Sequence, residues 1–101
     1  MKNKLVKNKL ADSLFLAILD LKNLDESRRF FRDLLTEEEI IEFSKRWKVA
    51  QMLSNKISYL KIERVTGMSS TTIARISKWL NSGMSGYKFM LERLHHRSIS
   101  H

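Results

Sequence analysis

Apolar residues recur at helical spacing along most of the chain and predict an all-α protein of about six helices. From Leu14 to Leu21 they cover nearly the whole circumference of a first helix, which Asp12 or Ser13 would cap. A helix that is apolar most of the way round needs burial on more than one side. In a chain of 101 residues, a second subunit could supply that burial.

Two further helices are expected in the middle of the chain. Asp25 can cap one that runs to about Leu35. The next begins with a capping box, in which Thr36 takes the cap and Glu39 reaches back. The acids Glu37 to Glu39 also suit the helix dipole, which explains them without acid–base or cation chemistry. The apolar positions of this helix are Ile40, Phe43, Trp47, Ala50 and Leu53.

Residues 58–80, SYLKIERVTGMSSTTIARISKWL, have the pattern of a helix-turn-helix. Ser58 and Ser69 can cap two short helices, and Gly67 between them can adopt the positive φ that a tight turn requires. The residues expected to pack the two helices together are Ile62, Val65, Met68, Ile73, Ile76 and Leu80.

The opposite side of the second short helix suits the major groove of duplex DNA. Its residues are Ser70, Thr71, Ala74, Arg75 and Lys78. Small hydroxyls, methyl groups and cations match base edges and phosphates, and the helix start at Ser69 can receive a phosphate. The alternative is an ordinary helical hairpin with a polar solvent face. Such a face normally mixes charges of both signs, whereas Ser69–Leu80 contains no acid.

The charge distribution also points to a polyanionic partner. The chain has 19 Lys and Arg against 11 Asp and Glu, a net charge of +8. The excess lies in residues 1–11 and 58–101, while residues 12–57 are nearly neutral. The lysines of the first segment are Lys2, Lys4, Lys7 and Lys9. They either contact phosphates or only keep the protein soluble.

These patterns predict three parts. Residues 1–11 are expected to form a flexible basic arm, and residues 12–95 a single helical domain. The last helix of that domain should run from about Ser85 to His95, after a stop at Gly83. Residues 96–101 are expected to fray.

Composition and motifs exclude several classes of protein. The chain has no cysteine, and its longest apolar run, Leu14–Leu19, is far shorter than the roughly 20 residues of a membrane span. We therefore expect a cytoplasmic protein without a signal peptide or membrane segment. No phosphate-binding loop or catalytic triad spacing occurs, so we expect no enzyme. The histidines His95, His96 and His101 fit a frayed tail better than a metal site, and we expect no metal or cofactor.

Three segments, residues 14–40, 45–53 and 58–83, resemble the tryptophan repressor family and, more closely, its related bacterial proteins of undefined ligand. The resemblance implies an intertwined all-helical homodimer with two helix-turn-helix heads. It also implies that Ser70, Thr71 and Ala74 face bases. The positions that it places near the DNA backbone, on the preceding helix, are Tyr59, Leu60 and Glu63. We predict that Lys61, a basic residue of the same helix, is a further DNA contact.

The resemblance also implies where an effector would bind. In the tryptophan repressor, two arginines and a threonine clamp the corepressor, and they match Arg46, Arg75 and Thr36. The family glycine that leaves room for the indole falls at Ile76, and a family serine falls at Trp79. Because both add bulk, tryptophan is not expected as a corepressor. A smaller or anionic effector could use the arginines instead.

Arg46 has a simpler interpretation as well, because it can pair with Glu42 four residues earlier on an exposed helix face.

The sequence thus predicts a dimeric regulator of transcription, a repressor, that binds specific double-stranded DNA with the 69–80 helix in the major groove. The alternative is a helical adaptor that binds protein or RNA without operator recognition. Leu60 and Glu63 favour the alternative, because both are poor phosphate ligands.

Overall fold

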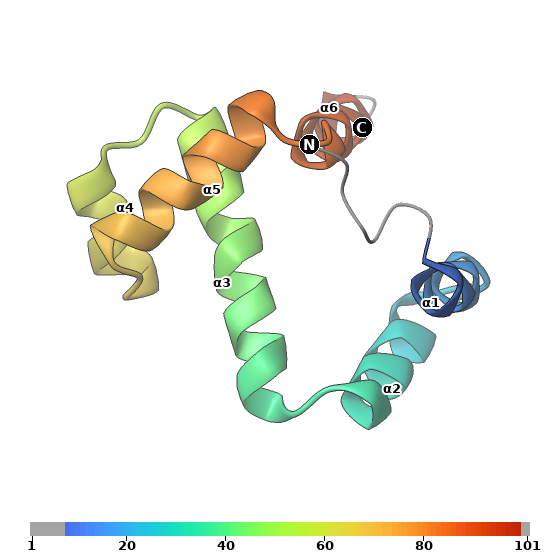
Figure 1. The fold of residues 1–101 in the computed structure, drawn as a ribbon. Helices are drawn as coiled ribbons and strands as arrows, with labels where there is room; N and C mark the ends of the chain where they lie inside the picture. The colour runs from blue at the N-terminus through green and yellow to red at the C-terminus, as the bar shows by residue number, and fades with distance from the viewer. Residues whose placement is uncertain (1–7, 100–101) are drawn as a thin grey trace. The chain divides into compact units, whose positions relative to one another are not determined.

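The computed structural model is all α-helical over residues 8–99, the residues that the structure describes, with no strand among them (Figure 1). The side chains of His96, Ser98 and Ile99 are not part of that description. The helices are α1 (Lys9–Leu19), α2 (Leu24–Leu34), α3 (Glu37–Ser54), α4 (Tyr59–Thr66), α5 (Ser70–Ser82) and α6 (Gly86–Ile99). The chain divides into two compact units, with the boundary between Ile40 and Ile41.

Asparagines cap the two helices of the first unit. The Asn8 side chain accepts a hydrogen bond from the N–H of Ala11 at 3.1 Å, so α1 begins at Lys9. The Asn23 side chain accepts from the N–H of Glu26 at 2.9 Å. The predicted caps at Asp12 or Ser13 and at Asp25 are therefore wrong. Each predicted cap lies inside a helix, because an asparagine upstream already satisfies the first N–H groups.

The first unit leaves much apolar surface exposed. None of the residues of α1 or α2 is buried. Leu14 and Ile18 are half-buried on one side of α1, but Leu10 is 85% exposed and Leu19 is 80% exposed. The first unit by itself therefore leaves apolar residues of α1 uncovered, as expected for a helix that is apolar most of the way round.

The core lies in the second unit, where the end of α3 packs with α4 and α5 (Figure 1). Its buried apolar residues are Val49, Ala50, Met52, Ile62, Met68, Ile73, Ile76 and Leu80. Of the apolar positions predicted for α3, Ala50 is buried, whereas Phe43 remains 49% exposed. The predicted burial of Val65 is wrong, since it is 54% exposed. The short helix α4 turns Ile62 and Thr66 inward instead.

The segment between α5 and α6 turns at a glycine that allows close approach. The N–H of Gly83 donates to the carbonyl of Trp79 at 2.9 Å and ends α5. A Cβ on Gly83 would lie 2.5 Å from that carbonyl oxygen, so only glycine fits. The helix α6 begins at Gly86 and continues to Ile99, past His95, where the sequence predicted its end.

Part of the sequence prediction concerns residues that the structure does not describe. Residues 1–7, with Lys2, Lys4 and Lys7, lie outside the described residues, as do residues 100–101. Lys9 belongs to α1. The predicted arm, domain and tail boundaries stay predictions. None of the helices in the described part of the chain is long and apolar enough to cross a membrane.

Candidate nucleic-acid interface

The helix α5 has one buried side and one exposed side, as predicted. Ile73 and Ile76 are 0% exposed and Leu80 is 9% exposed, so they anchor α5 in the core of the second unit. The residues on the other side are all exposed: Ser70, Thr71, Ala74, Arg75 and Lys78. The helical periodicity that fixes the anchors therefore also determines which side chains can meet a ligand.

The cations of this exposed side have no acidic partner among residues 8–99. The ion pairs found there lie on α2 and α3, such as Arg29 with Asp25 at 3.2 Å. Neither Arg75 nor Lys78 takes part in one. Because α5 carries no acid of its own, both cations remain available to an anionic ligand.

The start of α5 is held by its cap. The Ser69 hydroxyl oxygen accepts from the N–H of Thr72 at 3.2 Å, as predicted for the cap, and the hydroxyl donates to Thr72 Oγ1 at 3.1 Å. A phosphate at this helix end would therefore meet backbone N–H groups of the first turn rather than the Ser69 side chain.

The turn between α4 and α5 is closed by backbone and side-chain hydrogen bonds. Gly67 has a φ of 73°, and its N–H donates to the carbonyl of Glu63 at 2.8 Å. The Thr66 hydroxyl donates to the carbonyl of Ile62 at 2.7 Å and accepts from the N–H of Met68 at 3.2 Å. The predicted glycine turn is confirmed, and Thr66 is a further residue of this turn that was not predicted from the sequence.

The helix α4 presents a mixed surface. Ser58 caps it as predicted, accepting from the N–H of Lys61 at 3.2 Å. Tyr59 is 41% exposed, Lys61 is exposed, and Leu60 is 57% exposed. Glu63 is only partly exposed. Tyr59 and Lys61 are thus accessible to a ligand, while Leu60 offers only apolar contact.

The residues of the predicted effector pocket have separate structural roles. Arg46 pairs with Glu42 at 3.5 Å, as the simpler interpretation predicted, and lies over the Phe43 ring at 5.7 Å. Ile76 lies in the core, whereas Arg75, one position earlier on α5, is exposed.

Thr36 forms the predicted capping box with Glu39. The Thr36 hydroxyl oxygen accepts from the N–H of Glu39 at 3.1 Å, and Glu39 Oε1 accepts from the N–H of Thr36 at 2.9 Å. Thr36 is therefore engaged at the start of α3.

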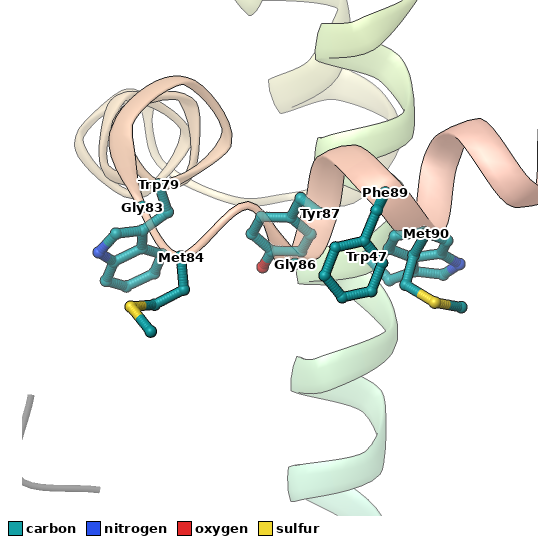
Figure 2. A pocket seen from close by; sticks show the side chains of 8 residues that line it. All are labelled: Trp47, Trp79, Gly83, Met84, Gly86, Tyr87, Phe89 and Met90. Carbon is teal, nitrogen blue, oxygen red and sulfur yellow. The ribbon is translucent and has the colours of Figure 1, made fainter. Parts of the chain in front are cut away.

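An apolar groove of about 570 Å³ lies beside α5 and was not predicted (Figure 2). Its lining residues are Trp47, Trp79, Gly83, Met84, Gly86, Tyr87, Phe89 and Met90. The rings of Trp47 and Tyr87 are stacked with centroids 6.3 Å apart. Burial raises the pKa of the Tyr87 hydroxyl, and the positive charge of Arg46 acts in the opposite direction. Trp79, whose bulk was expected to disfavour tryptophan as a corepressor, is 43% exposed at this groove.

Among the described residues, no three His, Asp or Glu side chains are grouped as metal ligands. The side chain of His96 and all of His101 lie outside them.

Comparisons with known proteins agree with this architecture. The chain is 44% identical over 89 residues to the "uncharacterized protein YerC" of Bacillus subtilis, covering 88% of this chain and 86% of that protein. A crystal structure of a TrpR-like protein from Eubacterium eligens matches with a TM-score of 0.87 and 44% identity, over 92% of this chain and 96% of that one. A candidate Trp repressor from Staphylococcus aureus matches with a TM-score of 0.86 and 37% identity, over 94% and 95% of the two chains.

The family described as Trp repressor protein matches residues 9–95, which include all of α1 to α5 and most of α6. The chain is therefore a member of the Trp repressor family.

Proposed function

We propose that the protein is a transcriptional regulator, a repressor, that binds specific double-stranded DNA with α5 in the major groove. The observation that carries this proposal is the exposed side of α5, which is free of acids and opposite a fully buried anchor. A helix that is fixed on one side and offers hydroxyls, a methyl group and cations on the other is suited to reading base pairs. Membership of the Trp repressor family supports the same function.

The exposed residues of α4 and α5 would make different kinds of contact with DNA. Ser70, Thr71 and Ala74 would contact base edges, because short hydroxyl and methyl groups match the donors, acceptors and thymine methyls of the major groove. Arg75 and Lys78 would contact guanine or phosphate. The exposed Tyr59 and Lys61 of α4 would contact the backbone.

The regulator would act as a homodimer. The exposed apolar residues of α1 and the apolar groove of the second unit are surfaces that a second copy of the chain would cover. Two α5 helices related by a twofold axis would read two half-sites about one helical turn of DNA apart, roughly 34 Å.

Tryptophan would not serve as the corepressor. Ile76 is 0% exposed and belongs to the packed core, and Trp79 adds further bulk near the end of α5. A preformed orientation of α5 would then need no ligand. Any effector would differ from tryptophan, and an anionic group would suit Arg46 and Arg75.

The experiment that tests this function is selection of a binding site from random duplex oligonucleotides. We expect an enriched sequence with two related half-sites. Titrations of the selected duplex, a random duplex and a single strand at two salt concentrations should then show a marked preference for the selected duplex. Failure to enrich any sequence would contradict the proposal.

A second candidate function is that of a protein-binding adaptor. It is favoured by the exposed apolar residues Leu60 and Val65 on α4, which are 57% and 54% exposed and cannot bind phosphate. The same titrations distinguish the two functions, because an adaptor would show no preference among duplexes and no steep dependence on salt.

A further inference from the structure

The end of α4 contains a buried polar side chain at the point where the chain turns toward α5. Thr66 is 6% exposed, in a core that is otherwise apolar over the described residues. Its hydroxyl is satisfied in both directions, as donor to the carbonyl of Ile62 and as acceptor from the N–H of Met68. One oxygen atom therefore connects the last turn of α4 to the chain beyond the turn.

Gly67, which lies between Thr66 and Met68, cannot hold the turn by side-chain packing. Gly67 has no side chain, and a Cβ added to it would meet nothing within 4 Å. Its φ of 73° is one of several conformations open to glycine. Two hydrogen bonds restrict this choice: the Gly67 N–H donates to the carbonyl of Glu63, and the Met68 N–H donates to the Thr66 hydroxyl, so the second bond involves the first residue beyond the glycine.

Three residues, Gly67 to Ser69, separate the two helices. Met68 is itself buried, and Ser69 caps α5 directly after it. A change in the backbone direction at Met68 would therefore change the orientation of α5, because only Ser69 lies between them.

Resting on the proposed function, we propose that Thr66 is a positioning residue for DNA recognition: its buried hydroxyl sets the angle of α5 against α4. Base contacts require side chains held within about 0.5 Å of their productive geometry, whereas phosphate contacts tolerate larger displacements. The Thr66 hydroxyl should therefore matter for binding of the selected sequence and much less for binding of any duplex.

A different result is expected if Thr66 only fills space in the core. If Thr66 only fills the core, valine should replace it without loss, since the two side chains have similar shape and valine suits an apolar core. If the hydroxyl positions α5, Thr66→Val leaves the N–H of Met68 without its partner, while Thr66→Ser keeps the hydrogen bond.

The test compares the wild-type chain with Thr66→Val and Thr66→Ser, and with Val49→Ala as a control that destabilises the same core from α3. Affinity is measured for the selected duplex and for a random duplex, at a temperature where every variant is folded. Amide hydrogen exchange at Met68 is measured without DNA.

We expect Thr66→Val to weaken binding of the selected duplex at least about tenfold and binding of the random duplex less than about twofold. Exchange at Met68 should accelerate in Thr66→Val by more than its loss of global stability explains, and in Val49→Ala by no more than that loss explains. Thr66→Ser should restore selected-site affinity, and Val49→Ala should leave the ratio of the two affinities unchanged.

Normal binding of the selected duplex by Thr66→Val would overturn the inference, as would equal losses on both duplexes or unchanged exchange at Met68. These outcomes are distinct from a failure of the proposed function. A wild-type chain that selects no duplex refutes DNA reading itself, whereas a selected site that Thr66→Val binds normally refutes only the role of Thr66.

Discussion

Neighbouring residues of α5 have opposite roles. Ile76 is completely buried, while Arg75, one position earlier, is exposed on the side that we assign to DNA. Substitutions on the exposed side should therefore change binding while leaving the stability of the fold within about 0.5 kcal/mol of wild type. This separation allows recognition to be tested residue by residue.

The first prediction concerns base reading by α5. Thr71→Ala should change the preferred base at one position in each half-site, because the hydroxyl contacts a base edge. Lys78→Ala should weaken binding to all sequences by similar factors, because a phosphate contact carries no sequence information. Site selection repeated with Thr71→Ala measures the first effect, and titrations of the selected and random duplexes with Lys78→Ala measure the second. An unaltered base preference in Thr71→Ala would mean that α5 enters the groove in another orientation.

The second prediction concerns the effector. Free tryptophan should neither bind with micromolar affinity nor strengthen DNA binding, since Ile76 occupies the core at the position where the resemblance implies a glycine that leaves room for the indole. Calorimetry with millimolar tryptophan, together with DNA titrations with and without it, measures this. Micromolar binding combined with a clear gain in DNA affinity would show that a pocket forms despite Ile76 and Trp79.

At the scale of elements, the sequence predicted helices better than helix ends. The side-chain caps at Thr36, Ser58 and Ser69 were identified correctly, Thr36 because Glu39 completes its capping box and Ser69 because it directly follows the glycine turn. The caps at Asn8 and Asn23 were missed because Asp12, Ser13 and Asp25 offered the same chemistry nearby. Sequence spacing alone does not decide between two competent caps that lie within about one turn of each other.

Burial was harder to predict than helicity. The exposed and buried sides of α5 follow from its period, but Val65 was placed in the core by its apolar character alone. The inward residue is Thr66, whose hydroxyl finds two backbone partners inside the turn. The apolar groove was missed for a related reason, since it depends on how α6 leaves the turn after Gly83 and on a ring from α3.

The third prediction concerns the basic arm. Deleting residues 1–7 leaves the Asn8 cap of α1 in place. The deletion should weaken binding to all duplexes by similar factors and flatten the dependence of affinity on salt, because Lys2, Lys4 and Lys7 would each neutralise a phosphate. Replacing these three lysines by glutamine in the full-length chain is the matched control. An unchanged salt slope would assign the arm to solubility alone.

At the scale of the whole molecule, the fourth prediction is dimerisation. Sedimentation at micromolar concentration should report about twice the chain mass of 11.9 kDa, because the exposed apolar residues of α1 need a partner. Leu19→Lys should shift the protein toward monomer, since burial of one leucine side chain contributes about 1.5–3 kcal/mol. Ser13→Lys, which adds the same charge at an exposed polar position of α1, is the control.

A well-behaved monomer of the wild-type chain would contradict the dimer. Equal effects of the two lysine substitutions would show that charge on α1, rather than loss of an apolar contact, shifts the assembly.

The close approach of Gly83 to the Trp79 carbonyl has a consequence for how freely this chain can vary. Exposed positions usually accept many residues, but at Gly83 even alanine would force the last turn of α5 to shift. At Gly86, three positions later, an added Cβ would meet nothing within 4 Å. In a saturation mutagenesis library selected for a folded product, position 83 should therefore retain glycine almost alone, while position 86 should tolerate alanine and other small residues.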